Sequence, residues 1–142
     1  MRRARFVVEE KTGKIILVED DDNFRLMLKK LIQGRFPHTA IEEAREGNEA
    51  MEKIAALHPD LIFMDIRLPK ENGLVLTKKI KELYPQAQVI ILTGFDLPEY
   101  REAALESGAS FFASKQNSSA KDILDFVNMA LSAAKGPPAG VN

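Results

Sequence analysis

Residues 61–65 read Leu-Ile-Phe-Met-Asp, four large apolar side chains followed directly by a carboxylate. A short apolar run of this kind is typical of a strand that is buried on both faces of a sheet. Nearly unbroken runs recur at 15–18, 89–92 and 110–113, and a weaker one lies at 39–44. The sequence therefore predicts five short strands spread along the chain.

Helical spacing fills the stretches that follow these runs. Apolar residues from Phe24 to Ile32 recur at i, i+3, i+4, i+7 and i+8, the core-facing stripe of an amphipathic helix. Similar stripes lie within 50–55, 76–83, 98–104 and 123–131. Pro98 fits the first turn of the fourth helix and Gly108 its end, while Ser119 and Asp122 resemble a capping box before the fifth.

Strand and helix thus alternate five times, which predicts an α/β fold: a five-stranded parallel sheet in a doubly wound (βα)5 three-layer sandwich. Ligands of such sheets bind outside the carboxyl ends of the strands. We expect one domain at 14–134, an N-terminal extension at 1–13 and a C-terminal tail or linker at 135–142. The residues that follow each strand are the ones to examine for chemistry.

Composition narrows the function classes. The 142 residues contain no cysteine, which excludes disulfides, thiolate metal sites and thiol nucleophiles. The net charge of -1 provides no general basic field for nucleic acid or an anionic membrane. No run approaches the roughly 18 apolar residues of a membrane span, and no signal peptide is evident, so we expect a cytoplasmic protein that contacts neither membrane nor nucleic acid directly.

The first strand ends in four consecutive acids, Glu19-Asp20-Asp21-Asp22. Asp21 or Asp22 is expected to cap the following helix, but a cap accounts for only one or two of the four. Carboxylates gathered at one strand end repel one another unless a cation lies among them. The run therefore indicates a site for a hard divalent ion.

Three other strand ends complete the pattern. Asp65 follows the third strand, Thr93 the fourth and Lys115 the fifth. Taken singly, these are an ordinary turn aspartate, an uninformative threonine and a surface lysine. Together with the acids they supply a carboxylate nucleophile, a cation site, a hydroxyl and an ammonium, which are the groups that phosphoryl transfer requires.

Four segments in this order resemble the motifs of the response-regulator receiver domain, the phosphoacceptor of two-component signalling: ILVEDDDNFR, LIFMDIRLPKENGL, VIILTG and GASFFASK. The resemblance covers about 14–134 and implies a flavodoxin-like, CheY-like fold. It implies that Asp65 accepts the phosphoryl group. It also implies a Mg²⁺ ion held by Asp20 directly, Glu19 through water, Asp65, and the backbone carbonyl of Arg67.

The resemblance also assigns a switch. Thr93 and Lys115 are expected to contact phosphoryl oxygens, and Phe112 to occupy the aromatic switch position. Phe112 lacks the hydroxyl of the commoner tyrosine, and Gln116 replaces the proline that often follows the lysine. A cis peptide at that bond is therefore disfavoured by about 3 kcal/mol.

The partners implied are a sensor histidine kinase or phosphotransfer protein, and an output domain or target bound through the fourth helix, fifth strand and fifth helix. Homodimer formation stays open, as does the question whether the chain stands alone or belongs to a longer regulator. The domain is expected to assist its own phosphorylation and dephosphorylation without being an enzyme. Two alternatives remain: an unphosphorylated receiver-like scaffold, and a phosphatase of the haloacid-dehalogenase kind, which Arg67 disfavours because it stands where that family has a second aspartate.

Overall fold

The computed structural model describes residues 12–134. The strands are β1 (Gly13–Val18), β2 (Thr39–Ala44), β3 (Leu61–Met64), β4 (Arg67–Leu68), β5 (Glu71–Asn72), β6 (Gln88–Thr93) and β7 (Phe111–Ser114). The helices are α1 (Asp22–Arg35), α2 (Gly47–Leu57), α3 (Gly73–Leu83), α4 (Pro98–Glu106) and α5 (Ala120–Ala134). The extension and tail expected at 1–13 and 135–142 lie almost entirely outside the described residues, apart from Thr12 and Gly13.

The main sheet has five strands in the order β2-β1-β3-β6-β7, and every neighbouring pair is parallel. This confirms the predicted doubly wound α/β fold. All five carboxyl ends therefore lie at one edge of the sheet, and the strand order reverses at β1 and β3. That edge is where the candidate residues converge.

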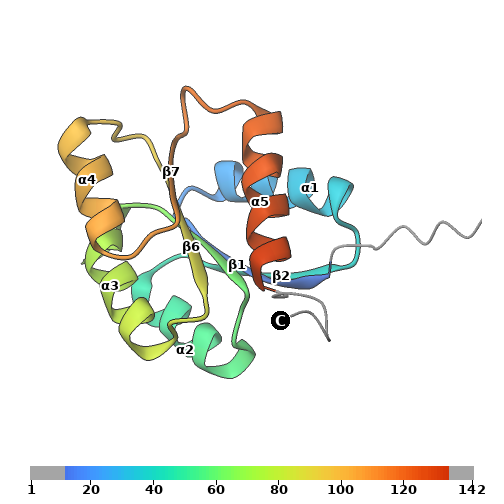
Figure 1. Cartoon of the computed structure of the whole chain (residues 1–142), viewed down its shortest axis with the longest axis horizontal. Coiled ribbons are helices and arrows are strands. Elements are labelled where there is room, and N and C mark those ends of the chain that lie inside the picture. The colour runs from blue at the N-terminus through green and yellow to red at the C-terminus, as the bar shows by residue number, and fades with distance from the viewer. Residues whose placement is uncertain (1–11, 135–142) are drawn as a thin grey trace, which may run out of the picture.

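Helices cover both faces of the sheet (Figure 1). Helices α1 and α5 pack on one face over alternate strand residues such as Leu17 and Phe63. Helices α2, α3 and α4 pack on the other face over the intervening residues, such as Val18 and Met64. Because successive strand side chains point to opposite faces and both faces are buried, the inner strands β1, β3 and β6 need apolar residues at nearly every position, whereas the edge strand β2 exposes Ala40 and Glu42. The unbroken runs in the sequence follow from this arrangement.

The structure departs from the sequence expectation at four places. β1 begins at Gly13, two residues before the predicted strand, and β6 spans Gln88–Thr93, one residue longer at each end than the predicted 89–92. β7 spans Phe111–Ser114, which is the predicted 110–113 shifted by one residue toward the C-terminus. A small antiparallel pair, β4 and β5, occupies the segment after β3 that reads as a turn. Within the part of the chain that the structure describes, no helix has the length and apolar character needed to cross a membrane.

The capping and helix-breaking residues predicted from the sequence lie at the ends of α1, α4 and α5. The side chain of Asp21 accepts a hydrogen bond from the backbone N–H of Phe24 at 3.0 Å, which starts α1 as one of the two expected caps. Ser119 and Asp122 exchange hydrogen bonds of 2.9 and 3.1 Å, so the predicted capping box before α5 is present. Pro98 occupies the first turn of α4, and Gly108, at φ 102°, follows its end.

Candidate functional site

The candidate residues meet at the carboxyl edge of the sheet. Glu19 follows β1, Asp65 follows β3, Thr93 ends β6 and Lys115 follows β7. Backbone hydrogen bonds continue the sheet beyond these strands: the N–H of Asp65 donates to the Val18 carbonyl at 3.1 Å, and that of Lys115 to the Thr93 carbonyl at 2.9 Å. The sheet itself therefore fixes where the side chains begin.

Lys115 joins two carboxylates. Its Nζ lies 2.6 Å from Oε1 of Glu19 and 3.0 Å from Oδ2 of Asp65. Glu19 and Asp65 are buried, with 4% and 6% of their surface exposed. The same Nζ lies 4.6 Å from the ring centroid of Phe24, so an aromatic face from α1 covers the ammonium. The phosphoacceptor predicted from the sequence thus has a cation in direct contact.

Burial and charge shift the titration of this pair. The pKa of the Glu19 carboxyl is raised to about 7, mainly because the group is buried. The hydrogen bond from Lys115 lowers this pKa and the charge of Asp65 raises it, but burial has the largest effect. Burial alone lowers the pKa of the Lys115 ammonium, but its hydrogen bonds to Glu19 and Asp65 prevail and raise that pKa above its ordinary value. The lysine is therefore firmly cationic at neutral pH.

A group of three acids fits a metal ion. Carboxylate oxygens of Glu19, Asp20 and Asp65 all lie within 4.8 Å of one another. Oδ1 of Asp65 is buried and accepts no hydrogen bond from any described residue, whereas Oδ2 is held by Lys115. A buried, unpaired carboxylate oxygen is costly unless a cation or donor reaches it. The oxygen donor set and the unpaired atom both suit Mg²⁺.

The other two acids of the run serve different purposes. Asp21 caps α1, while Asp22 is exposed and pairs with Arg25 at 2.8 Å and with Arg45. The hydrogen bonds from Arg45 and then Arg25 lower the pKa of the Asp22 carboxyl. Of the four consecutive acids, Glu19 and Asp20 thus belong to the cluster, Asp21 caps a helix, and Asp22 forms ion pairs with two arginines.

Thr93 and Phe112 lie on the neighbouring strands β6 and β7. Thr93 is fully buried, and its Oγ1 accepts a hydrogen bond from the N–H of Phe95 at 3.3 Å. Phe112 pairs in register with Ile91 and packs in the core beneath α4. The guanidinium of Arg101, from α4, lies 4.9 Å from the ring centroid of Phe112. Thr93 therefore lies at the carboxyl edge of the sheet, and Phe112 lies two register positions further from that edge, on the neighbouring strand.

Arg67 lies in β4, two residues after Asp65, in register with Asn72 of β5. Its guanidinium stacks 4.0 Å from the ring centroid of Phe95, which follows Thr93. Arg67 and Phe95 thus connect the two loops beside Asp65. At the third loop, the N–H groups of Gln116 and Asn117 both donate to Oγ of Ser114 at 3.2 Å, and all peptide bonds among the described residues are trans.

Two residues at the site carry no clear signal in the sequence. Phe24 contacts Lys115 from α1, and Arg25 donates from Nη1 to the backbone carbonyl of Glu19 at 2.7 Å. The spacing of Asp22 and Arg25, three apart on one helix, predicts their own ion pair. Nothing in the spacing predicts that the arginine also reaches the strand end.

Comparisons with known proteins agree with this geometry. The family profile described as "Response regulator receiver domain" matches residues 15–128. The transcriptional regulatory protein LnrK of Bacillus subtilis (strain 168) is 42% identical over 105 residues, covering 74% of this chain and 48% of LnrK. The chemotaxis protein CheY of Thermotoga maritima is 34% identical over 103 residues, covering 72% of this chain and 86% of CheY.

A solved structure shows the same fold. A crystal structure of a two-component response regulator of the LuxR family from Aurantimonas sp. SI85-9A1 superposes with a TM-score of 0.79 at 28% identity, covering 86% of each chain. The present chain spans about half or less of the length of several curated relatives that it matches, including LnrK. With its parallel sheet, its strand-end residues and its matched profile, this chain belongs to the receiver domain family of two-component response regulators.

Proposed function

We propose that the chain accepts a phosphoryl group on Asp65 from the phosphohistidine of a sensor histidine kinase or phosphotransfer protein, or from a small acyl phosphate. The observation that carries this proposal is the asymmetry of the Asp65 carboxylate. Lys115 holds Oδ2 at 3.0 Å, while Oδ1 is buried with no hydrogen bond. One oxygen is thus oriented by a fixed charge, and the other keeps its lone pairs for a metal ion or for phosphorus.

The transfer is written as an in-line displacement. An O–P bond forms to the Asp65 carboxylate as the N–P bond of phosphohistidine breaks, and its electron pair returns to the imidazole nitrogen. Lys115 stays protonated throughout and offsets charge on the phosphoryl oxygens, in keeping with its raised pKa. The hydroxyl of Thr93 then turns from its bond with Phe95 to donate to a phosphoryl oxygen.

A Mg²⁺ ion is the cofactor that this site suits. Asp20 directly, Glu19 through water, Asp65, and the backbone carbonyl of Arg67 would hold it, and the close grouping of the three carboxylates supports this set. When bound, the ion offsets negative charge on the transferred group. Glu19 is already held by Lys115 at 2.6 Å, so a role through water, without breaking that ion pair, is consistent with its position.

Phosphorylation would be transmitted to the surface by a change in side-chain packing. Movement of Thr93 opens space for Phe112 to repack, which alters the face formed by α4, β7 and α5 for a target or output domain. Arg101 stacks on Phe112 from α4, so repacking of the ring changes a contact on that face. LuxR-family similarity supports a DNA-binding output domain as a partner, with DNA contacted there and not by the 14–134 receiver domain. A homodimer is a second form of association.

The same proposal covers the remaining properties. The domain assists its own phosphorylation and dephosphorylation but does not turn over a separate substrate, acts in the cytoplasm, and has no contact with the membrane. An unphosphorylated scaffold is the alternative, disfavoured because Asp20, Asp65 and Lys115 are all in place. A haloacid-dehalogenase-type phosphatase is less well supported because Arg67 replaces the second aspartate and stacks on Phe95.

The experiment is labelling with acetyl phosphate and Mg²⁺, read by intact mass. We expect one hydroxylamine-labile phosphoryl group per chain, lost in Asp65→Asn and kept in Asp96→Asn, a control aspartate that pairs with Arg101 at 3.1 Å. A folded chain that takes no label supports the scaffold. Continuous hydrolysis of a phosphomonoester supports the phosphatase.

A further inference from the structure

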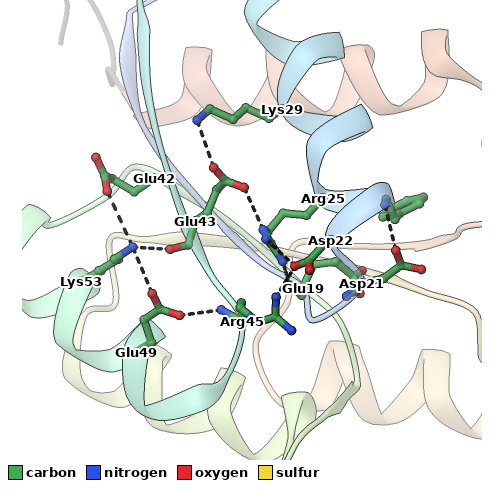
Figure 2. A network of polar contacts seen from close by, with 11 residues as sticks. Glu19, Asp21, Asp22, Arg25, Lys29, Glu42, Glu43, Arg45, Glu49 and Lys53 are labelled. Atoms are coloured by element: carbon green, nitrogen blue, oxygen red, sulfur yellow. Dashed lines mark hydrogen bonds and ion pairs between the residues drawn. The ribbon is translucent and has the colours of Figure 1, made fainter.

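The side chain of Arg25 lies at the junction of three chain segments next to the acidic cluster (Figure 2). Only 11% of this side chain is exposed. Its Nε donates to Oε1 of Glu43 in β2 at 2.8 Å, its Nη1 to the carbonyl of Glu19 at 2.7 Å, and its Nη2 to Oδ1 of Asp22 at 2.8 Å. Each of the three guanidinium nitrogens therefore donates one hydrogen bond, in a planar geometry that an ammonium cannot reproduce.

The carbonyl of Glu19 is the functionally important acceptor. This carbonyl belongs to the peptide unit that joins Glu19 to Asp20, two of the three carboxylates that group within 4.8 Å. A hydrogen bond at 2.7 Å from a guanidinium fixes the plane of that peptide. The directions in which the two side chains leave the backbone are fixed with it.

Glu43, the carboxylate that anchors Arg25, is itself held in place. Glu43 also accepts a hydrogen bond at 3.0 Å from Nζ of Lys29, so its carboxylate is oriented from two sides. The hydrogen bond from Arg25 lowers the pKa of Glu43, which keeps the carboxylate charged. Arg25 is thus tied to β2, a strand that runs parallel to β1 in the sheet, and is not free to follow movements of the loop after β1.

Arg25 also separates the acids. With Arg45 it holds Asp22 in ion pairs (Figure 2), and this fourth carboxylate is not among the three that group within 4.8 Å. The charge of Arg25 is matched by Asp22 and Glu43, so the arginine orients the loop without placing an unpaired positive charge beside the metal ligands. Of the four consecutive acids, Glu19 and Asp20 remain for the ion.

We propose that Arg25 is a positioning residue for the divalent ion: it orients the peptide between Glu19 and Asp20 and thereby sets the affinity of the site for Mg²⁺. The inference rests on the proposed Mg²⁺ site and assigns no contact between Arg25 and the ion. Residues that orient metal ligands in this way typically account for a 10–100-fold difference in metal affinity.

The test measures Mg²⁺ binding to the unphosphorylated protein by isothermal titration calorimetry, with urea unfolding as the check of the fold. Arg25→Met keeps the length of the side chain and removes every donor, and Arg25→Lys keeps the charge without the fork. Arg45→Met is the matched control, because Arg45 also pairs with Asp22 but is 57% exposed and has no bond to the Glu19 carbonyl.

We expect the Mg²⁺ dissociation constant to rise about 10-fold or more in Arg25→Met and by a smaller factor in Arg25→Lys, with Arg45→Met within about twofold of the unaltered protein. In acetyl phosphate labelling, the Mg²⁺ concentration for half-maximal rate should shift by the same factor while the rate at saturating Mg²⁺ stays within about twofold. A purely structural role would change the urea midpoint and leave this Mg²⁺ midpoint in place.

Unaltered Mg²⁺ affinity in folded Arg25→Met, or an equal loss in Arg45→Met, would overturn the inference. Should Arg25→Met not fold, Arg25→Lys decides in the same way. Absence of Mg²⁺ binding by the unaltered protein is a separate outcome, which removes the proposed metal site and the inference together.

Discussion

Gly73 lies against the backbone of Asp65, so that a Cβ at Gly73 would stand 1.9 Å from the Asp65 carbonyl oxygen and 3.0 Å from Cα of Ile66. The N–H of Gly73 donates to the Ile66 carbonyl at 2.7 Å. The start of α3 therefore packs directly on the loop that carries Asp65, the proposed phosphoacceptor. Only a residue without a side chain allows this approach, because the atoms in the way are backbone atoms that cannot rotate aside.

Gly73→Ala is accordingly expected to displace the Asp65 loop. We predict a loss of about 2 kcal/mol or more in the free energy of unfolding, and a fall in the rate of acetyl phosphate labelling by at least about tenfold in the molecules that remain folded. Gly34→Ala is the matched control, since Gly34 lies on α1 with nothing within 4 Å of its added Cβ. That change should raise stability by up to about 1 kcal/mol. Equal effects of the two substitutions on labelling would contradict the prediction.

Lys115→Met should leave the carboxylates of Glu19 and Asp65 buried without their cation. We expect a loss of about 2 kcal/mol near pH 8, less than for a fully buried pair because Lys115 is 19% exposed. Added Mg²⁺ should then raise the melting temperature more in the variant than in the unaltered protein, because the ion replaces the missing charge. Lys121→Met, which removes an exposed pair with Asp125, serves as the control. Identical Mg²⁺-induced shifts in all three proteins would refute this account.

Acid is expected to weaken the contact between β2 and α1 through Glu43. The hydrogen bond from Arg25 holds the folded pKa of this carboxyl below its ordinary value of 4.5. A lowered folded pKa gives stability that is present above the unfolded pKa and lost as the pH falls through the folded one. Water screens this partly exposed pair, so the contribution stays below about 1 kcal/mol. Urea midpoints of Glu43→Gln and the unaltered protein should differ at about pH 7 and converge toward about pH 3 at low salt; a constant difference would speak against the pair.

Ser119→Ala removes half of the capping box of α5. The exchange of hydrogen bonds between Ser119 and Asp122 should contribute about 1 kcal/mol, measured as the change in the urea unfolding free energy relative to Ser118→Ala. Labelling of Asp65 should be unchanged, because the cap lies beyond the loop that follows Lys115. A slower labelling rate, measured where the variant is still fully folded, would show that the start of α5 takes part in the site.

The fold could be predicted because a strand that is buried on both faces of the sheet has consecutive apolar residues, which the sequence shows directly. The run at 61–64 is apolar throughout and coincides with β3, whereas β4 and β5 have two residues each, too few for any periodicity to register. The strand β7 ends one residue later than expected, at Ser114. This polar residue can be buried there because its hydroxyl oxygen accepts hydrogen bonds from two backbone N–H groups, which the sequence composition does not reveal.

The site was predictable to the extent that it follows strand ends. Asp65 and Lys115 meet because parallel strands bring their carboxyl ends to one edge, a consequence of topology alone. The contacts of Arg25 with Glu43 and of Phe24 with Lys115 join helix α1 to a residue of β2 and to the residue after β7, and they depend on side-chain directions that spacing does not determine. Sequence patterns therefore indicate the candidate reacting groups more readily than the residues that hold them.

The ion pairs of Lys115 have a consequence for the order of folding and metal binding. A polypeptide that brings its own counter-ion to two buried carboxylates can complete folding before any divalent ion arrives. The Mg²⁺ concentration would then govern how readily the folded protein takes up a phosphoryl group, without governing how much folded protein there is. The amount of folded receiver domain and its readiness to be phosphorylated would thus depend on separate variables.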